Sequence, residues 1–122
     1  MKNFPDITKD ISASLRELRK EIPDTLAGFS TLSQAAAKEG ALSAKTKELI
    51  AMALGVAARC DGCLGFHAEK LVKLGATRQE VAEAIGVAVQ MGGGPSLMYA
   101  ADGYAAFLQF EQKAAAVTPA AG

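Results

Sequence analysis

The residues best suited to chemistry lie close together in the middle of the chain. Cys60-Asp61-Gly62-Cys63 is a Cys-x-x-Cys, and His67, the only histidine, follows Cys63 by four positions. If a helix begins at Asp61 or Gly62, Cys63 lies in its first turn, where free backbone N–H groups and the helix dipole stabilise a thiolate. His67 then lies on the same face one turn later, and Cys60 is within reach of Cys63 for a disulfide. The spacing suits a dithiol that cycles with a disulfide, with the imidazole moving the proton.

Two other interpretations of the cysteines stay open. The pair could be half of a zinc site, but structural zinc takes four ligands, so Glu48 would have to join His67 and the two thiols. The cysteines could also be buried and inert, as free cysteines often are. Covalent haem attachment requires a histidine directly after the second cysteine, where this chain has Leu64.

Glu48 is the only charged residue between positions 48 and 58. A helix that is apolar all round is normally buried, so we expect Glu48 to be at least half-buried and to need a partner. At 1.5 Å per residue, Glu48 lies roughly 15 Å before the turn between two helices and His67 about 9 Å after it. The glutamate side chain, a bridging water or an oblique crossing could close that offset. The alternative is an exposed Glu48 paired with Lys45 or with the helix N-terminus.

Composition excludes several classes of partner. The 122 residues carry 13 Lys+Arg and 13 Asp+Glu, so the chain has neither the basic surface of a nucleic-acid binder nor the charge that binds an anionic membrane. The longest strictly apolar run, over residues 49–58, is far short of the roughly 20 residues of a membrane span, and the first residues lack the apolar run of a signal peptide. We therefore expect a cytoplasmic protein, in which a structural disulfide would be unusual. Half of the residues are hydrophobic, many of them alanine, which favours a helical protein stabilised by forming a homo-oligomer.

Helical periodicity predicts an all-α fold of about six helices, in one domain over residues 1–113, with a disordered tail at 114–122. The first helix has Asp6 as its N-cap and ends before Pro23. The second covers residues 24–38, and Gly40 is expected to end it in a left-handed conformation. Four residues of this helix are expected to face inward. Those four are Leu26, Phe29, Leu32 and Ala36.

The four remaining helices are placed by capping signals. Ser43 is expected to cap a helix that ends near Arg59, and the next one covers residues 61–75. The capping box Thr77-Arg78-Gln79-Glu80 opens the fifth helix, which ends at the glycines of residues 92–94. Ser96 is expected to cap a sixth helix that ends near Lys113.

The spacing of Glu48, Cys60, Cys63 and His67 resembles that of the alkylhydroperoxidase D-like proteins of the carboxymuconolactone decarboxylase superfamily. The resemblance covers roughly residues 20 to 110. It includes three flanking stretches, Lys45-Thr46-Lys47-Glu48-Leu49-Ile50, Gly75-Ala76-Thr77 and Met91-Gly92-Gly93-Gly94-Pro95. That family is all-α and commonly assembles as trimers or hexamers.

The resemblance implies a role for each site residue. Cys63 would be the thiol that reacts with a small hydroperoxide and becomes a sulfenic acid. Cys60 would donate a proton and then close the disulfide, which protects the sulfenic acid from over-oxidation. His67 would activate Cys63, and Glu48 would orient or charge-balance His67. No bound cofactor or metal is implied, and the disulfide would be reduced by an external dithiol such as a lipoylated protein.

Two alternatives to this alkylhydroperoxidase-type oxidoreductase stay open, the first of them implied by the same resemblance. One is a decarboxylase-like enzyme without a redox role, and the other is a non-enzymatic redox-sensing oligomer. The alkylhydroperoxidase D proteins carry a second histidine between the two cysteines, where this chain has Asp61-Gly62. Asp61 would oppose thiolate formation through its like charge, or it could cap the helix that follows.

Overall fold

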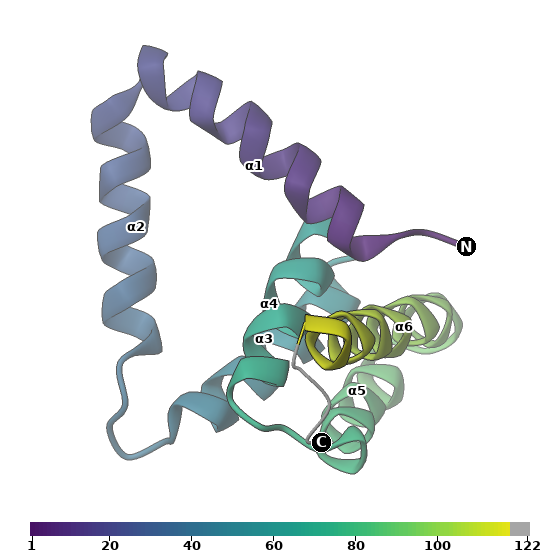
Figure 1. The fold of residues 1–122 in the computed structure, drawn as a ribbon. Helices are drawn as coiled ribbons and strands as arrows, with labels where there is room; N and C mark the ends of the chain where they lie inside the picture. Colours follow the sequence, from purple (N-terminus) through teal and green to yellow (C-terminus); the bar gives the residue numbers. More distant parts are fainter. Residues whose placement is uncertain (118–122) are drawn as a thin grey trace, which may run out of the picture.

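The computed structural model describes residues 1–117 and shows an all-α fold, as expected (Figure 1). No helix within these residues is both long and apolar enough to cross a membrane. The elements are α1 (Phe4–Glu21), α2 (Pro23–Ala37), α3 (Ala44–Ala57), α4 (Asp61–Lys73), α5 (Arg78–Gly92) and α6 (Gly94–Val117).

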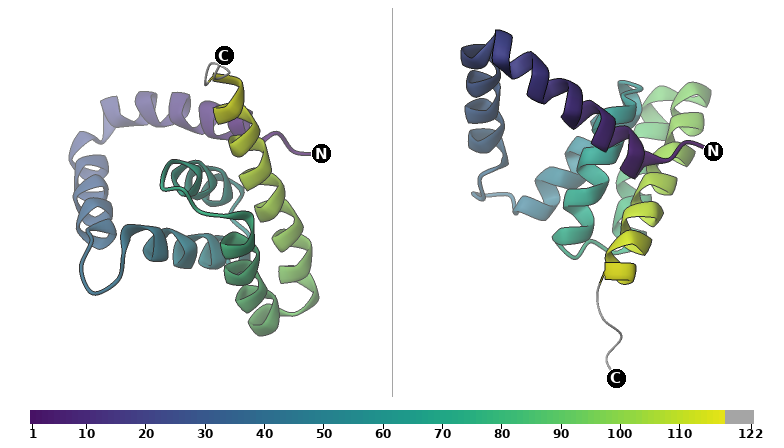
Figure 2. Two further views of the ribbon diagram at one scale, coloured as in Figure 1. Left: turned by 60° about the horizontal axis from the view of Figure 1, so that its bottom comes forward. Right: turned by 45° about the horizontal axis from the view of Figure 1, so that its top comes forward.

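The core lies among α3, α4, α5 and α6 and is closed by the first turns of α1. Helix α4 packs against α3 and α6, and α5 packs against the same two helices (Figures 1 and 2). Fully burying one large apolar side chain contributes about 1.5–3 kcal/mol, so a few such residues account for much of the packing energy. The largest fully buried side chains are Phe4, Phe107, Met52, Leu64, Leu71, Val56 and Val81.

Helix α2 stands apart from this core. Figure 2 (left) shows α1, α2 and α3 as three sides of a frame with α4 inside it. None of the residues of α2 is buried, and the side chains of Phe29 and Leu32 are 67% and 64% exposed. The prediction that one face of this helix packs into the core of its own chain is therefore wrong, because α2 contacts only its neighbours α1 and α3.

Capping explains most of the helix boundaries. Ser43 and the Thr77–Glu80 capping box open α3 and α5 as predicted. Helix α1 is capped by Asn3 rather than Asp6, because the Asn3 side chain accepts the Asp6 N–H and leaves Pro5 in the first turn. Gly40 is not left-handed, since among the described residues only Arg59, Gly75 and Gly93 have positive φ.

Helix α6 differs from its prediction at both ends. It begins at Gly94, directly after Gly93 at φ 70°, so Ser96 is a buried residue inside the helix rather than its cap. It continues past Lys113 to Val117, because the three alanines after Lys113 are the strongest helix formers. Of the tail predicted at residues 114–122, the first four residues are helical and the rest lie outside the described part of the chain.

Glycines allow α1 to lie directly on the first turns of α4. A Cβ atom added at Gly65 would lie 2.5 Å from the Thr8 side chain, and one added at Gly62 would lie 2.7 Å from the Ile11 side chain. Real Cβ atoms essentially never approach so closely, so a larger residue at Gly65 would require the short, branched Thr8 side chain or a helix to move. At Gly62 the flexible end of Ile11 could move instead. Because Gly62 lies between the two cysteines, the close approach also places α1 over the Cys-x-x-Cys.

This close packing can be tested with one substitution. Gly65→Ala should lower the free energy of unfolding by about 1–3 kcal/mol, the usual cost of overpacking, although alanine is the better helix former by about 1 kcal/mol. Urea unfolding followed by circular dichroism measures the change.

Two further variants isolate the cause. Gly86→Ala, at a position in α5 where a Cβ would meet nothing within 4 Å, should instead raise stability by about 0.5–1 kcal/mol. Combining Gly65→Ala with Thr8→Ser removes the clashing methyl group and should recover most of the loss. If Gly65→Ala stabilises the protein as Gly86→Ala does, the close α1–α4 contact is absent in solution.

Candidate functional site

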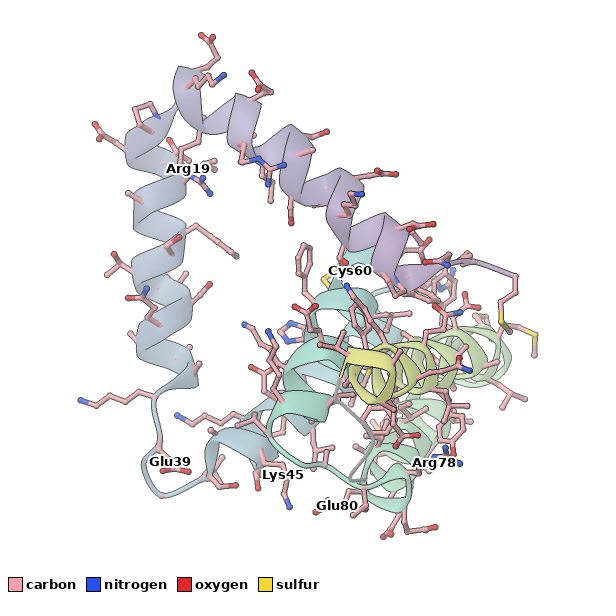
Figure 3. The ribbon with its side chains drawn as sticks, viewed as in Figure 1. Arg19, Glu39, Lys45, Cys60, Arg78 and Glu80 are labelled. Carbon is pink, nitrogen blue, oxygen red and sulfur yellow. A yellow bond between two sulfur atoms is a disulfide. The ribbon has the colours of Figure 1, made fainter. Side chains whose placement is uncertain are left out.

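The two cysteines form a disulfide at the start of α4. Helix α3 ends at Ala57, and Arg59 reverses the chain with a positive φ of 56°, a conformation that costs a non-glycine residue roughly 1–2 kcal/mol. Cys60 is then the N-cap of α4, and its Sγ is bonded to that of Cys63 across a Cα–Cα distance of 5.2 Å. Figure 3 shows Cys60 at the end of α4 nearest α1.

The free backbone N–H at this helix end is directed at Cys60. The Cys63 N–H donates to the Cys60 Sγ at 3.2 Å, which is the bond that an N-cap side chain makes. The sequence led us to expect this stabilisation at Cys63. The structure gives it to Cys60, so a thiolate formed on Cys60 would receive it.

His67 and Glu48 form a direct contact. His67 Nδ1 lies 2.6 Å from Glu48 Oε2, so the side chains close the offset between α3 and α4 without an intervening water. The Glu48 side chain is 9% exposed and that of His67 is 27% exposed. A carboxylate at Nδ1 holds the ring in one orientation and favours the tautomer in which Nε2 accepts protons. This is the arrangement expected of a histidine that acts as a base.

The alternative partner for Glu48 is ruled out. Lys45 instead makes an ion pair with Glu80 at 2.9 Å, and Figure 3 shows both near the lower edge of the molecule, away from Cys60. A lysine, Lys70, lies farther from Glu48, with its Nζ 4.0 Å from Oε1. The buried carboxylate therefore has one close partner, His67, and one looser partner.

An open pocket of about 490 Å³ lies over the disulfide. Both cysteines and His67 line it, together with residues of α1, α2 and α4. A second hollow, of about 260 Å³, lies on the α3 side and shares only Cys63 and His67 with the first. Sequence reasoning missed the contribution of the first two helices, although their apolar stripes were visible. The remaining lining residues of the larger pocket are Ile11, Phe29, Ser33, Gly62, Phe66 and Lys70.

Asp61, between the cysteines, is paired with a residue that sequence analysis did not consider. Lys2 Nζ lies 3.1 Å from Asp61 and 2.9 Å from Asp102, over the ring of Tyr99. The carboxylates of Asp102 and Asp61 raise the pKa of Lys2 above its usual range. The negative charge that would disfavour a neighbouring thiolate is thus offset by an ammonium group, and Asp61 also lies favourably in the first turn of α4.

The zinc interpretation has no geometric support among the described residues. Within residues 1–117, no three His, Cys, Asp or Glu side chains gather as metal ligands would. The four residues singled out by spacing form two pairs, the Cys60–Cys63 disulfide and the Glu48–His67 contact, and both cysteines and His67 line one pocket.

Comparison with known proteins agrees with the resemblance in the motif. A family model described as the carboxymuconolactone decarboxylase family matches residues 23–107. The crystal structure of a carboxymuconolactone decarboxylase family protein from Legionella pneumophila is 59% identical with a TM-score of 0.88, covering 91% of this chain and 99% of that one. A structure from Thermotoga maritima is 25% identical with a TM-score of 0.76, covering 88% and 98% of the two chains. An uncharacterized protein of Cupriavidus necator is 36% identical over 108 residues, which are 83% of this chain and 96% of that protein.

The Lys2–Asp61 contact predicts an electrostatic effect on the reduced cysteines. Lys2→Gln removes the charge that offsets Asp61, so the thiolate becomes less favourable and the midpoint of alkylation against pH should rise. The rise should be a few tenths of a pH unit, because the Lys2 and Asp61 side chains are 39% and 38% exposed and water screens such pairs. Iodoacetamide labelling of the reduced protein measures it.

A matched control separates this contact from loss of charge in general. Lys20→Gln removes a lysine that is also in an ion pair, with Glu17 on α1, but lies far along the helix from the cysteines and should leave the midpoint unchanged. The double variant Lys2→Gln/Asp61→Asn should return the midpoint to the wild-type value. The assignment of Lys2 as the group that offsets Asp61 would be contradicted if Lys2→Gln left the alkylation midpoint unchanged, or if Lys20→Gln shifted it equally.

Proposed function

Because this chain belongs to the carboxymuconolactone decarboxylase family and carries a disulfide beside a histidine–carboxylate pair, we propose that it is a thiol–disulfide oxidoreductase that reduces hydroperoxides. The single observation that carries the proposal is the placement of Cys63 and His67 on one face of α4, with Glu48 holding the far nitrogen of the ring. A pair of inert cysteines would require neither the oriented histidine nor a pocket over the sulfur atoms.

In the reduced protein, Cys63 is the residue that reacts with peroxide. Its thiol gives a proton to His67, and the thiolate attacks the terminal oxygen of the hydroperoxide. An S–O bond forms, the O–O bond breaks, and the departing alkoxide takes the proton of the Cys60 thiol and leaves as an alcohol. Cys63 is then a sulfenic acid, and Cys60 is a thiolate held by the Cys63 N–H.

The second step closes the disulfide. The Cys60 thiolate attacks the Cys63 sulfur, the S–S bond forms, and hydroxide leaves with the proton held by His67 as water. The two cysteines are oxidised by two electrons, and the hydroperoxide is reduced to alcohol and water. The product of this step is the disulfide that the structure contains.

An external dithiol returns the site to its reduced form. Attack on Cys63, which faces both hollows, expels Cys60 as a thiolate that the Cys63 N–H stabilises. A lipoyl group carried by a partner protein has the required chemistry, since its two thiols end as a cyclic disulfide. The site needs no bound cofactor in this scheme.

The exposed apolar residues of α2 and α3 support assembly of the chain as a homo-oligomer, with the trimers or hexamers of the family as the expected states. Leu32, Ile50 and Leu54 are between 46% and 64% exposed. Exposed apolar side chains in such numbers mark contact surfaces rather than solvent-facing helices. The proposal requires a mass in solution that is a multiple of 12.6 kDa.

The cysteine roles predict different trapped species. With an organic hydroperoxide and a sulfenic-acid trap, Cys60→Ser should give one stable adduct on Cys63, because nothing resolves the sulfenic acid. Cys63→Ser should give no adduct and no thiol-dependent peroxide consumption. Intact-protein mass spectrometry and a peroxide assay measure both outcomes.

Three results would overturn parts of this scheme. An adduct on Cys60 in the Cys63→Ser protein, with peroxide consumption retained, would reverse the two roles. Oxidation by one equivalent of peroxide with no return by dithiols would favour a redox sensor. Survival of both thiols in peroxide would leave a cysteine-independent member of the family, such as a decarboxylase-like enzyme.

The proton relay predicts a graded series of rates. His67→Ala should lower the single-turnover rate of peroxide reduction by about 10²–10⁴-fold, the usual contribution of a general base, and should change its pH dependence. Glu48→Gln keeps a hydrogen-bond acceptor for the ring nitrogen but removes the negative charge. The single-turnover rate should therefore fall less than in His67→Ala. Stopped-flow kinetics across pH measures both variants.

The comparison must use folded proteins, because His67→Ala leaves Glu48 with only the looser Lys70 contact. Circular dichroism and thermal melting therefore accompany each variant. A pH–rate profile that is unchanged in folded His67→Ala would remove this residue from the mechanism.

A further inference from the structure

We propose that the preferred substrate of this site is a hydroperoxide with an apolar body and a carboxylate, and that the Lys70 ammonium binds the carboxylate. The inference rests on the proposed peroxide chemistry and names the class of molecule that would undergo it. It comes from the walls of the pocket over the disulfide rather than from the cysteines themselves.

The walls of this pocket are apolar. Ile11 comes from α1, Phe29 from α2 and Phe66 from α4, with the disulfide and His67 between them. The volume of about 490 Å³ is within the usual range of small-molecule sites, and far larger than hydrogen peroxide requires. An extended apolar body would remove these side chains from water, which favours an organic hydroperoxide over an inorganic one.

A single lysine lines the pocket. Among the described lining residues, Lys70 is the only Lys, Arg, Asp or Glu. It follows Cys63 by seven positions, so both lie on one face of α4, about 10 Å apart along the helix axis at 1.5 Å per residue. A substrate that reaches both groups has its peroxide and its anion at opposite ends.

Lys70 has the capacity to bind this anion. Its side chain is 53% exposed, and its contact with Glu48 is 4.0 Å long, whereas His67 lies 2.6 Å from the same carboxylate. The three donors of the ammonium group are thus only loosely occupied. The four-carbon stem can lie along the apolar wall while the charge meets the substrate in water.

Comparison of a matched pair of substrates tests the proposal. The probes are ω-hydroperoxynonanoic acid and its methyl ester, which differ in charge but share the peroxide and the chain. For the wild-type protein, kcat/KM should be about two- to fivefold higher for the acid, the range that an exposed ion pair contributes. In Lys70→Gln this preference should disappear because the rate with the acid falls more than the rate with the ester, and Lys70→Arg should restore it.

Lys73→Gln is the matched control. Lys73 is also on α4, is 73% exposed and pairs with Glu69 at 3.7 Å, but it does not line the pocket over the disulfide. This variant should keep the wild-type preference. Raised salt should reduce the preference of the wild-type protein and leave the rate with the ester unchanged.

The outcomes separate this inference from the proposed function. If the wild-type protein reduces acid and ester equally well, the inference is wrong. If Lys70→Gln slows both substrates equally, Lys70 acts through Glu48 alone and the inference is also wrong. If neither peroxide is reduced, the proposed function fails, and binding then decides the inference. Protection of the reduced cysteines from alkylation by unreactive nonanoate should occur in wild type and be lost in Lys70→Gln; absence of protection in wild type overturns it.

Discussion

The hydrogen bond between Glu48 and His67 sets the constraint on which the rest of the site depends. A carboxylate that is 9% exposed requires a partner, and the nearest one is on the following helix. Helices α3 and α4 must therefore pack in the relative position that brings these two side chains together. The tight reversal at Arg59 allows that position. The same reversal places Cys60 at the cap of α4 and Cys63 one turn before His67. One buried carboxylate thus links the reversal, the helix cap and the cysteine pair.

Most of the candidate site residues could be predicted from patterns between residues close together in the sequence. Cys63 and His67 are four positions apart, so helical periodicity alone predicts their common face, and Cys60 directly precedes that helix. Glu48 could be identified because a lone charge in an apolar helix requires a partner. The caps at Ser43 and Thr77 depend on hydrogen bonds over three residues, and such short-range contacts can be read directly from the sequence.

What could not be predicted depends on contacts between distant segments. The pairing of Lys2 with Asp61 spans 59 positions and has no pattern to reveal it. The sequence showed that one face of α2 is apolar. Periodicity does not say whether that face packs against the same chain or against another one. For that reason the sequence did not predict that Phe29 and Ser33 line the same pocket as the cysteines. It also did not predict that the Ile11 side chain packs directly on Gly62.

The short span of the disulfide has a consequence for the energetics of the whole domain. A cross-link stabilises a fold chiefly by restricting the unfolded chain, and the restriction grows with the length of the loop that it closes. Cys60 and Cys63 are separated by three positions, so closure contributes only about 2 kcal/mol, against about 4.7 kcal/mol for a loop of 100 residues. The domain therefore gains little when the bond forms and loses little when it opens. Reduction of this disulfide would therefore leave the fold in place.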